Sequence, residues 1–388
     1  MYSFDEVISR KKTMSVKWDF HEHHKQPPDA IPLWIADMDF PVPDEVSDVL
    51  LKAMEHKIFG YSDIVGEYFD AVYNWFNDTL NYQIKQEWII KTPGVVFVMG
   101  MAIKAFTNEW DSIIIQKPLY HPIEYTITAN KRIPVNSPLI YTGDSYEIDF
   151  DDFEKKVQEH DVKMFILCNP HNPVGRVFTE DELTKLGDIC KKYNVVVLSD
   201  EIHSDLVYEG HKHVVFSKIK DFQDFSIITT SPSKSFNIAG LQIANSFIAN
   251  DDMRQKMKDE ILATGYHQVS AFGLLGCVSV YNHGRTWYKE LMKYLAGNAA
   301  FIKNFVNENI PNVKVTDLQG TYLMWLNFNG LGLAPEKLDN LMKEAKIWPS
   351  NGRIFGEAGE GFFRFNIGTQ KSVLEKAMCQ LAEAVKGI

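Results

Sequence analysis

Short apolar runs alternate with helical patterns through the middle of the chain. Four runs are nearly continuous and end at polar, Pro or Gly residues, at 112–116, 164–168, 195–198 and 227–230. Their length and continuity predict buried strands. Between two of them, a capping box of Thr179 and Glu182 precedes apolar positions of helical spacing. Strands of this kind, joined through helices, predict a mostly parallel sheet that is covered on both faces.

The two ends of the chain follow a different pattern. Residues 1–30 are polar and irregular, and helical spacing begins only at 44–56 and 67–80. Beyond residue 284, long helical stretches flank short strand-like runs, at 285–309, 321–326, 335–346, 364–367 and 371–386. We therefore predict an α/β protein with a large domain (residues 45–284), whose mostly parallel seven-stranded sheet is covered by helices. A smaller α+β domain combines residues 1–44 with residues 285–388.

Composition and charge argue against several classes of protein. The formal net charge of −11 argues against general nucleic-acid binding, which needs a basic surface. No run of eighteen apolar residues predicts a membrane span, and the first residues do not have the pattern of a signal peptide. Four scattered cysteines fit a reducing cytoplasm, and no CxxC pair suggests zinc or redox chemistry.

Two polar clusters near the N-terminus each allow two interpretations. His21, His23 and His24 could bind a metal, or could lie in a solvated segment, because no Cys or carboxylate set completes the cluster. Asp37 and Asp39 lie among large apolar residues. Buried carboxylates need partners, so this segment either lines a site or an interface, or is an edge strand with two outward acids.

Lys234 is the strongest candidate for chemistry. It lies just past the strand predicted at 227–230, among the hydroxyls of Ser231, Ser233 and Ser235. A lysine in this position can be an ordinary solvated loop residue. Near apolar surface, however, its ammonium form is disfavoured and the free amine can attack a carbonyl, while the hydroxyls suit an oxyanion such as phosphate. These features predict a covalent bond to an aldehyde cofactor.

The other polar clusters also follow strands. Asn172 comes after the run at 164–168, and Asp200 comes after the run at 195–198. Because parallel strands end at one edge of a sheet, these side chains should meet Lys234 there. Asp200 can keep a ring nitrogen of the cofactor protonated, and Asn172 can donate to a ring oxygen. The backbone N–H groups of Val95 and Val96, at a predicted helix start, can hold the phosphate together with Ser231 and Ser233.

These motifs resemble those of a known family. Asn172-Pro173-x-Gly175, Ser199-Asp200-Glu201 and Ser231-x-Ser233-Lys234 look like the motifs of pyridoxal-phosphate enzymes with the class I/II aminotransferase fold (fold type I). The segments 34–40, 93–96 and 200–203 resemble the cystathionine β-lyase (MalY/PatB-type C–S lyase) family. Typical aminotransferases of this fold carry Tyr in place of His203 and Arg in place of Gln242, so the chain departs from them.

The resemblance implies an activity and roles for individual residues. The activity is β-elimination of sulfur amino acids to a thiol, pyruvate and ammonia, with pyridoxal 5'-phosphate as cofactor, no metal, and Lys234, Asp200 and Tyr120 as the catalytic set. Tyr120 is expected to stack on the cofactor ring, and His203 either contacts the ring oxygen or fills space. The substrate contacts implied are Arg364, for the α-carboxylate, Asn172 and Ala36. Tyr61 is expected to reach the cofactor of the neighbouring subunit in a homodimer.

Alternatives remain at this point. Tyr61 could be a turn aromatic, Arg364 a surface strand residue and Tyr120 a core aromatic. The same fold also supports an aminotransferase, or a regulatory protein that keeps the cofactor as a structural prop. A nicotinamide-dependent dehydrogenase is disfavoured, because no GxGxxG follows a strand.

Overall fold

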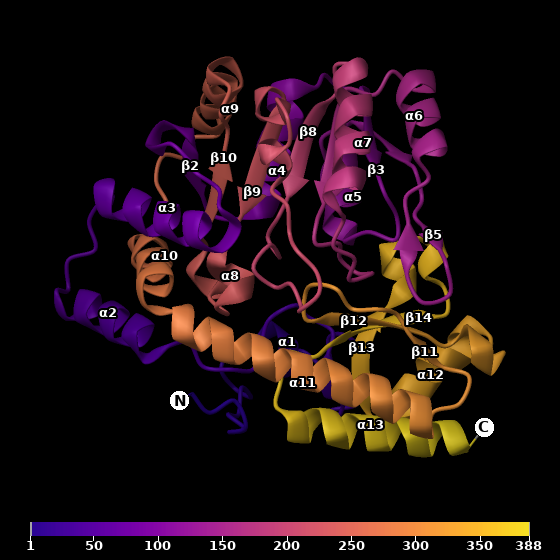
Figure 1. The fold of residues 1–388 in the computed structure, drawn as a ribbon. Helices are drawn as coiled ribbons and strands as arrows, with labels where there is room; N and C mark the ends of the chain where they lie inside the picture. The colour runs from indigo at the N-terminus through magenta and orange to yellow at the C-terminus, as the bar shows by residue number, and fades with distance from the viewer. Residues whose placement is uncertain (1, 388) are drawn as a thin grey trace.

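The computed structural model describes residues 2–387, and its largest element is a seven-stranded sheet (Figure 1). The strand order is β2-β10-β9-β8-β7-β3-β4. β10 is antiparallel to both of its neighbours, whereas the pairs among β3, β4, β7, β8 and β9 are parallel. The strands are β2 (Ile89–Thr92), β3 (Ser112–Ile115), β4 (Ile133–Asn136), β7 (Met164–Cys168), β8 (Val196–Asp200), β9 (Ser226–Thr230) and β10 (Ala244–Phe247).

Apolar side chains leave this sheet on both faces. In β7, Met164 and Ile166 join one core cluster, and Phe165 and Leu167 join the other. The first cluster includes residues of α4 (Val95–Phe106), α5 (His121–Ala129) and α9 (Asp251–Ala263). The second includes residues of α3 (Gly66–Leu80), α6 (Phe150–Glu159), α7 (Glu180–Lys192) and α10 (Ala271–His283). Burial on both faces explains why the strands are apolar without alternation.

A second sheet of five strands lies beside the first and has the order β1-β13-β14-β12-β11. β1 pairs in parallel with β13, so the N-terminal segment joins the C-terminal part of the chain. The strands are β1 (Ile31–Leu33), β11 (Lys314–Val315), β12 (Leu323–Asn327), β13 (Ile347–Asn351) and β14 (Phe362–Asn366). The long helices α11 (Arg285–Asn309) and α13 (Lys371–Lys386) run together along this part of the molecule, where both termini also lie (Figure 1). We propose that the large domain comprises residues 45–284 and that the small domain comprises the rest of the chain.

The remaining elements are short or peripheral. Besides short 3₁₀ helices, they are α1 (Val16–Asp19), α2 (Asp44–Glu55), α8 (Pro232–Ser235), α12 (Pro335–Glu344) and the hairpin of β5 (Ile140–Tyr141) and β6 (Tyr146–Glu147). Within residues 2–387, no helix combines the length and the apolar character needed to cross a membrane.

The predicted fold class is confirmed, with local differences. The four predicted strands are present, and the capping box of Thr179 and Glu182 begins α7. β8 extends to Asp200, so this acid is the last residue of the strand rather than a residue beyond it. Lys91 and Thr92, which directly precede Pro93 and Gly94, belong to β2, which pairs with β10.

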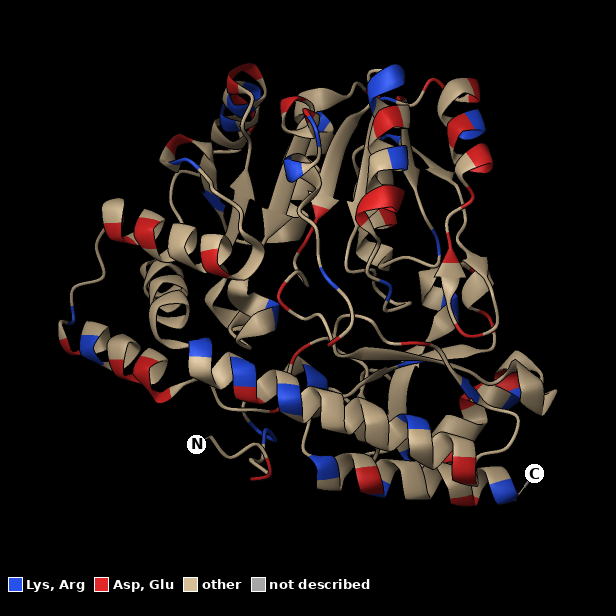
Figure 2. Cartoon of the chain, in the orientation of Figure 1, with Lys and Arg blue, Asp and Glu red and all other residues tan. Residues whose placement is uncertain are grey.

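Charged residues lie mainly on the outer helices and loops (Figure 2). Within the bounds given above, the seven strands of the large sheet contain two charged residues, Lys91 and Asp200. Asp200 is buried. A buried acid at the end of a central strand needs a specific partner, which directs attention to that edge of the sheet.

Candidate active site

A cavity of about 180 Å³ lies at the carboxyl ends of the parallel strands. It brings together nine of the residues predicted from the sequence: Ala36, Val95, Val96, Tyr120, Asn172, Asp200, His203, Ser233 and Lys234. Cys168 and Ile202, which the sequence did not single out, also line it. Ser231, Tyr61 and Arg364 do not, although Arg364 is bonded to Asn172. The convergence predicted from the strand ends is therefore present.

Lys234 lies on α8, directly after β9. Its Nζ donates a hydrogen bond of 2.6 Å to the carbonyl oxygen of Ala36. Burial lowers the pKa of the amine to about 8, and the charge of Arg364 acts in the same direction, while Asp37 and Asp200 oppose it. A substantial fraction of the amine is therefore neutral near pH 8, as a nucleophile or a general base requires.

Asp200 faces the same cavity from the end of β8. Burial raises the pKa of its carboxyl to about 7, and the charge of Glu201 adds to this; the N–H of Ile202, at 3.2 Å, and Lys234 oppose it. Among the described residues, no cation forms an ion pair with Asp200 within 4.0 Å. A positively charged group of a ligand in the cavity could therefore form an ion pair with Asp200.

Glu201 is adjacent in sequence, but its side chain belongs to a closed network. Its carboxylate accepts hydrogen bonds from Ser199 Oγ (2.9 Å) and from the Phe216 N–H (3.0 Å), and it lies 2.8 Å from His213 Nε2. In the motif Ser199-Asp200-Glu201, Asp200 is thus available to a ligand in the cavity, whereas Glu201 is occupied by hydrogen bonds within the protein.

Arg364, on β14, is buried without an acidic partner among the described residues. Its Nη1 donates to Asn172 Oδ1 (2.9 Å), and its Nη2 donates to the Trp34 carbonyl (2.6 Å) and to Ser350 Oγ (3.2 Å). Within residues 2–387, its Nε has no partner. Burial lowers the pKa of the guanidinium to about 10, which still leaves it charged at neutral pH. An unpaired buried cation fits a negatively charged ligand.

The N-terminus of α4 is the candidate phosphate site. Gly94 caps the helix without a side chain, and the first intrahelical bond runs from the Val98 N–H to the Gly94 carbonyl. In the described chain, the N–H groups of Val95, Val96 and Phe97 have no backbone partner. Such a helix start attracts anions through its free N–H groups and its dipole.

Two hydroxyls differ in their availability to this site. Ser233 lines the cavity, whereas Ser231 does not. The Ser231 hydroxyl donates to the Ile243 carbonyl (2.6 Å) and accepts from the Ser233 N–H (3.0 Å). A bond from Ser231 to phosphate would have to replace the first of these, so its role stays a prediction.

Three aromatic residues predicted for the site have different positions. Tyr120 lines the cavity, its N–H donates to the Asn172 carbonyl, and burial raises the pKa of its hydroxyl. His203 is buried; burial, Lys234 and Arg364 lower its pKa to about 3, so its ring is neutral. Tyr61 is fully exposed and outside the cavity. Its reach to a partner's cofactor stays a prediction.

Residues 34–40, here called the 34–40 loop, contribute Ala36 to the wall of the cavity. The carbonyl oxygens of residues 34–38 each accept a hydrogen bond from at least one side chain. The donors are Arg10, Lys17, Lys234, Asn237, Tyr322, Ser350, Arg364 and Asn366. Tyr322 shares the Ala36 carbonyl with Lys234, at 2.9 Å, and the sequence did not indicate this residue.

The two N-terminal clusters differ from the simpler expectations. β1 ends at Leu33, and Asp39 is buried and bonded to Lys17, Arg10 and Trp18, so an edge strand with two outward acids is wrong. The solvated interpretation of the histidines is wrong for His21, which is buried with its Nε2 2.9 Å from the Ala30 carbonyl. In the described part of the chain, no group of three or more His, Cys, Asp or Glu side chains could hold a metal ion.

The mostly parallel sheet, with a buried lysine amine and an acid at its carboxyl edge, defines a fold type I enzyme. The family model for aminotransferase class I and II matches residues 28–381, and the chain belongs to that family. It is 36% identical to the cystathionine β-lyase PatB of Bacillus subtilis, over 99% of this chain and 100% of the relative.

Two solved structures are closely similar. One, from Clostridium difficile, contains bound pyridoxal phosphate and is described as a candidate aminotransferase; it is 38% identical, with a TM-score of 0.97 and coverage of 99% of this chain and 100% of that one. The other is cystalysin from Treponema denticola, which contains pyridoxal 5'-phosphate; it is 34% identical, with a TM-score of 0.96 and coverage of 100% and 99%.

Proposed function

We propose that this protein is a pyridoxal-phosphate-dependent C–S lyase that cleaves sulfur amino acids to a thiol, pyruvate and ammonia. The observation that carries the proposal is one cavity holding the Lys234 amine and the Asp200 carboxyl, with the Arg364 guanidinium bonded to its wall. The relatives named as cystathionine β-lyase and cystalysin support this choice of reaction.

The residues around the cavity fit the cofactor in three places. The Lys234 amine suits its aldehyde, the unpartnered N–H groups at the start of α4 suit its phosphate, and Asp200 suits a protonated ring nitrogen. Tyr120 is available to stack on the ring, and Asn172 retains its Nδ2 as a donor because Arg364 occupies its Oδ1. When bound, the cofactor withdraws electrons from the substrate α-carbon.

The chain supplies binding and proton transfer. Arg364, with its free Nε, holds the substrate α-carboxylate beside Asn172. Lys234 removes the α-proton as a neutral amine, an effect worth on the order of 10²–10⁴-fold. The bond from the β-carbon to sulfur then breaks, sulfur keeps the electron pair, and the Lys234 ammonium returns a proton to it. Water converts the remaining three-carbon fragment to pyruvate and ammonia.

The test is an assay of purified, cofactor-loaded protein with L-cystathionine. We expect pyruvate, ammonia and homocysteine in equal amounts, and pyruvate also from simpler cysteine thioethers. Cofactor bound to Lys234, shown by visible absorbance and peptide mass spectrometry, without pyruvate from any of these substrates would overturn the lyase assignment.

An aminotransferase is the second candidate, because the similar Clostridium difficile protein is described in those terms. It would use the same lysine, acid and guanidinium but would return a proton to the cofactor instead of expelling sulfur. Turnover that requires a 2-oxo acid and releases no ammonia would favour it over the lyase.

We also propose a cytoplasmic homodimer in which Tyr61 completes the neighbouring site. Tyr61 is fully exposed, and large apolar side chains near it in the sequence are also exposed: Leu51, Met54, Ile58, Phe59 and Val65. A patch of this kind is typical of a protein interface. The four cysteines are unpaired, as expected in a reducing compartment. Analytical ultracentrifugation tests the dimer, and Tyr61→Phe should weaken cofactor retention.

A further inference from the structure

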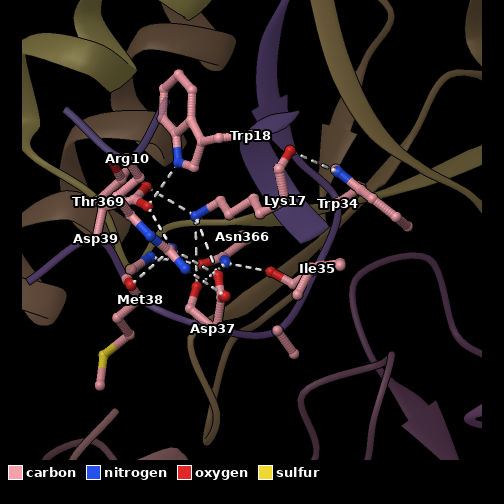
Figure 3. Close-up of polar contacts among 12 residues, drawn as sticks. Arg10, Lys17, Trp18, Trp34, Ile35, Asp37, Met38, Asp39, Asn366 and Thr369 are labelled. Atoms are coloured by element: carbon pink, nitrogen blue, oxygen red, sulfur yellow. Dashed lines mark hydrogen bonds and ion pairs between the residues drawn. The ribbon is translucent and has the colours of Figure 1, made fainter. Parts of the chain in front are cut away.

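Two acids and two bases form an ion-pair cluster behind the 34–40 loop (Figure 3). Arg10 binds Asp37 through two nitrogens, at 3.0 and 2.8 Å, and its Nη1 also lies 2.8 Å from Asp39 Oδ1. Lys17 is fully buried and contacts Asp39 at 2.7 Å and Asp37 at 3.8 Å. The cluster thus balances two negative charges with two positive charges.

The position of this cluster connects it to the cavity. Asp37 directly follows Ala36, whose carbonyl oxygen accepts the Lys234 hydrogen bond. A forked contact between a guanidinium and a carboxylate fixes the carboxylate plane as well as its distance. Arg10 also donates to the Met38 carbonyl at 3.1 Å. Arg10 therefore holds the loop on the far side of the residue that contacts the lysine.

The charged groups that act on Lys234 come from three elements. Asp200 acts on it from β8, Arg364 from β14, and Asp37 from the 34–40 loop. Neutral His203 and Tyr120 also line the cavity, and Tyr322 shares the Ala36 carbonyl. Among the described residues, Asp37 is the one of these three charges that is ion-paired to an opposite charge. Its effect on the amine consequently depends on its partners, Arg10 at 2.8 Å and Lys17 at 3.8 Å.

We propose that Arg10 is a positioning residue for Lys234: by pairing with Asp37 it holds the Ala36 carbonyl against the amine and offsets the Asp37 charge there. The inference rests on the proposed function in assigning Lys234 as the reactive amine. Without Arg10, Asp37 would keep only its 3.8 Å contact with Lys17. Its less compensated carboxylate would favour the ammonium form of Lys234, and less free amine would be present at neutral pH.

A second cavity makes the pair accessible to a chemical test. It measures about 300 Å³ and is lined by residues that include Arg10, Asp37 and Asn237. The side chains of Arg10 and Asp37 are 25% and 22% exposed. A small cation such as guanidinium can therefore reach the position that the Arg10 side chain would leave when shortened.

The experiment measures the pKa of the Lys234 amine in the cofactor-free protein, from the pH dependence of trinitrophenylation followed by peptide mass spectrometry. We expect Arg10→Ala to raise this pKa by roughly 0.5 to 1, and Asp37→Asn to lower it. The double variant Arg10→Ala, Asp37→Asn should lack the rise. Lys346→Met removes a surface ion pair with Asp29 and should leave the pKa unchanged.

Two further arms separate positioning from general stability. Millimolar guanidinium should return the pKa in Arg10→Ala toward the wild-type value and have no effect in the double variant. Arg10→Lys keeps the positive charge but loses the two-nitrogen contact with Asp37, so the pKa of Lys234 should lie between the values in the wild type and in Arg10→Ala. This variant replaces Arg10→Ala in the test if Arg10→Ala does not fold. An unchanged pKa in folded Arg10→Ala or Arg10→Lys overturns the proposal. Because labelling needs neither cofactor nor substrate, failure of the lyase assay is a distinguishable result.

Discussion

The carboxyl edge of the large sheet and the 34–40 loop face the same cavity but are built differently. At the sheet edge, Asp200 is in register with Cys168 of β7 and Thr229 of β9, so regular backbone pairing fixes its position. In the 34–40 loop, the backbone carbonyls are held by side chains from distant parts of the chain. The first region is placed by secondary structure, and the second depends on each of its tertiary contacts.

This difference predicts different consequences of substitution. At the sheet edge, a change should alter chemistry or titration while the strands keep their pairing. In the loop, a change should leave buried carbonyls without donors and reduce stability. Four substitutions test this contrast.

The largest effect is expected at Lys234. Lys234→Ala removes the amine, so pyruvate formation from L-cystathionine should fall on the order of 10²–10⁴-fold. The free energy of unfolding should change little, because Tyr322 still donates to the Ala36 carbonyl. Pyruvate assay and urea unfolding measure the two quantities. A loss of activity matched by a loss of folded protein would contradict the expected separation.

At Asp200, the expected change is in the pH dependence of stability. Its pKa in the folded protein is about 7, above the ordinary value. Between about pH 4 and pH 7, the folded protein therefore holds a proton that the unfolded chain has lost, so the free energy of unfolding falls as pH rises. Asp200→Asn should remove a fall on the order of 3 kcal/mol. Urea unfolding of cofactor-free protein at both ends of this range measures it; equal slopes in the two proteins would refute it.

For the 34–40 loop, the clearest test is Asn366, which contacts the loop from the end of β14. Its Nδ2 donates to the carbonyls of Ile35 and Asp37, and its Oδ1 accepts from the Gly368 N–H. Asn366→Ala leaves the Ile35 carbonyl and the Gly368 N–H without these partners and the Asp37 carbonyl with only the 3.4 Å contact from Lys17. It should cost about 2 kcal/mol of unfolding free energy. Asn329→Ala, at an exposed amide, is the matched control and should change stability much less. Similar costs at both positions would argue against a special dependence of the loop.

The smallest effect is expected at the cap of α7, in the regular part of the large domain. Thr179 accepts from the Glu182 N–H, and Glu182 accepts from the Thr179 N–H. Thr179→Ala should cost about 1 kcal/mol and leave pyruvate formation unchanged, whereas Thr179→Ser should restore most of the stability. A large change in activity would show that the helix and the site are coupled.

The residues at the sheet edge could be predicted from the sequence because the pattern that identifies them, an apolar run that ends at a polar residue, is local. Lys234 and Asp200 each follow or end an apolar run, so their meeting follows from parallel pairing. The assignment of Arg364 to the substrate carboxylate depended on resemblance, because nothing near it in the sequence indicates that it is buried beside Asn172. The strand Ala244–Phe247 was not predicted, because its polar Asn245 is buried through a partner far away, Tyr68.

The partners of the 34–40 loop could not be predicted in the same way. Two acids among apolar residues imply buried cations, but several basic residues precede them without periodic spacing. Arg10 and Lys17 are distinguished from Lys11, Lys12 and Lys25 only by the three-dimensional path of the chain. Tyr322 carries no motif, and its hydroxyl reaches the Ala36 carbonyl because β1 and β12, which precede and follow these residues, belong to the same five-stranded sheet.

The parallel pairing of β1 with β13 has a consequence for biosynthesis. Ile31 pairs with Ile347, so about 300 residues separate the partners in the chain. At roughly 5–20 residues per second, the first strand leaves the ribosome some tens of seconds before its neighbour is made. During that interval β1 has no strand to pair with, whereas Arg10 and Lys17, the partners of Asp37 and Asp39, are already present in the nascent segment.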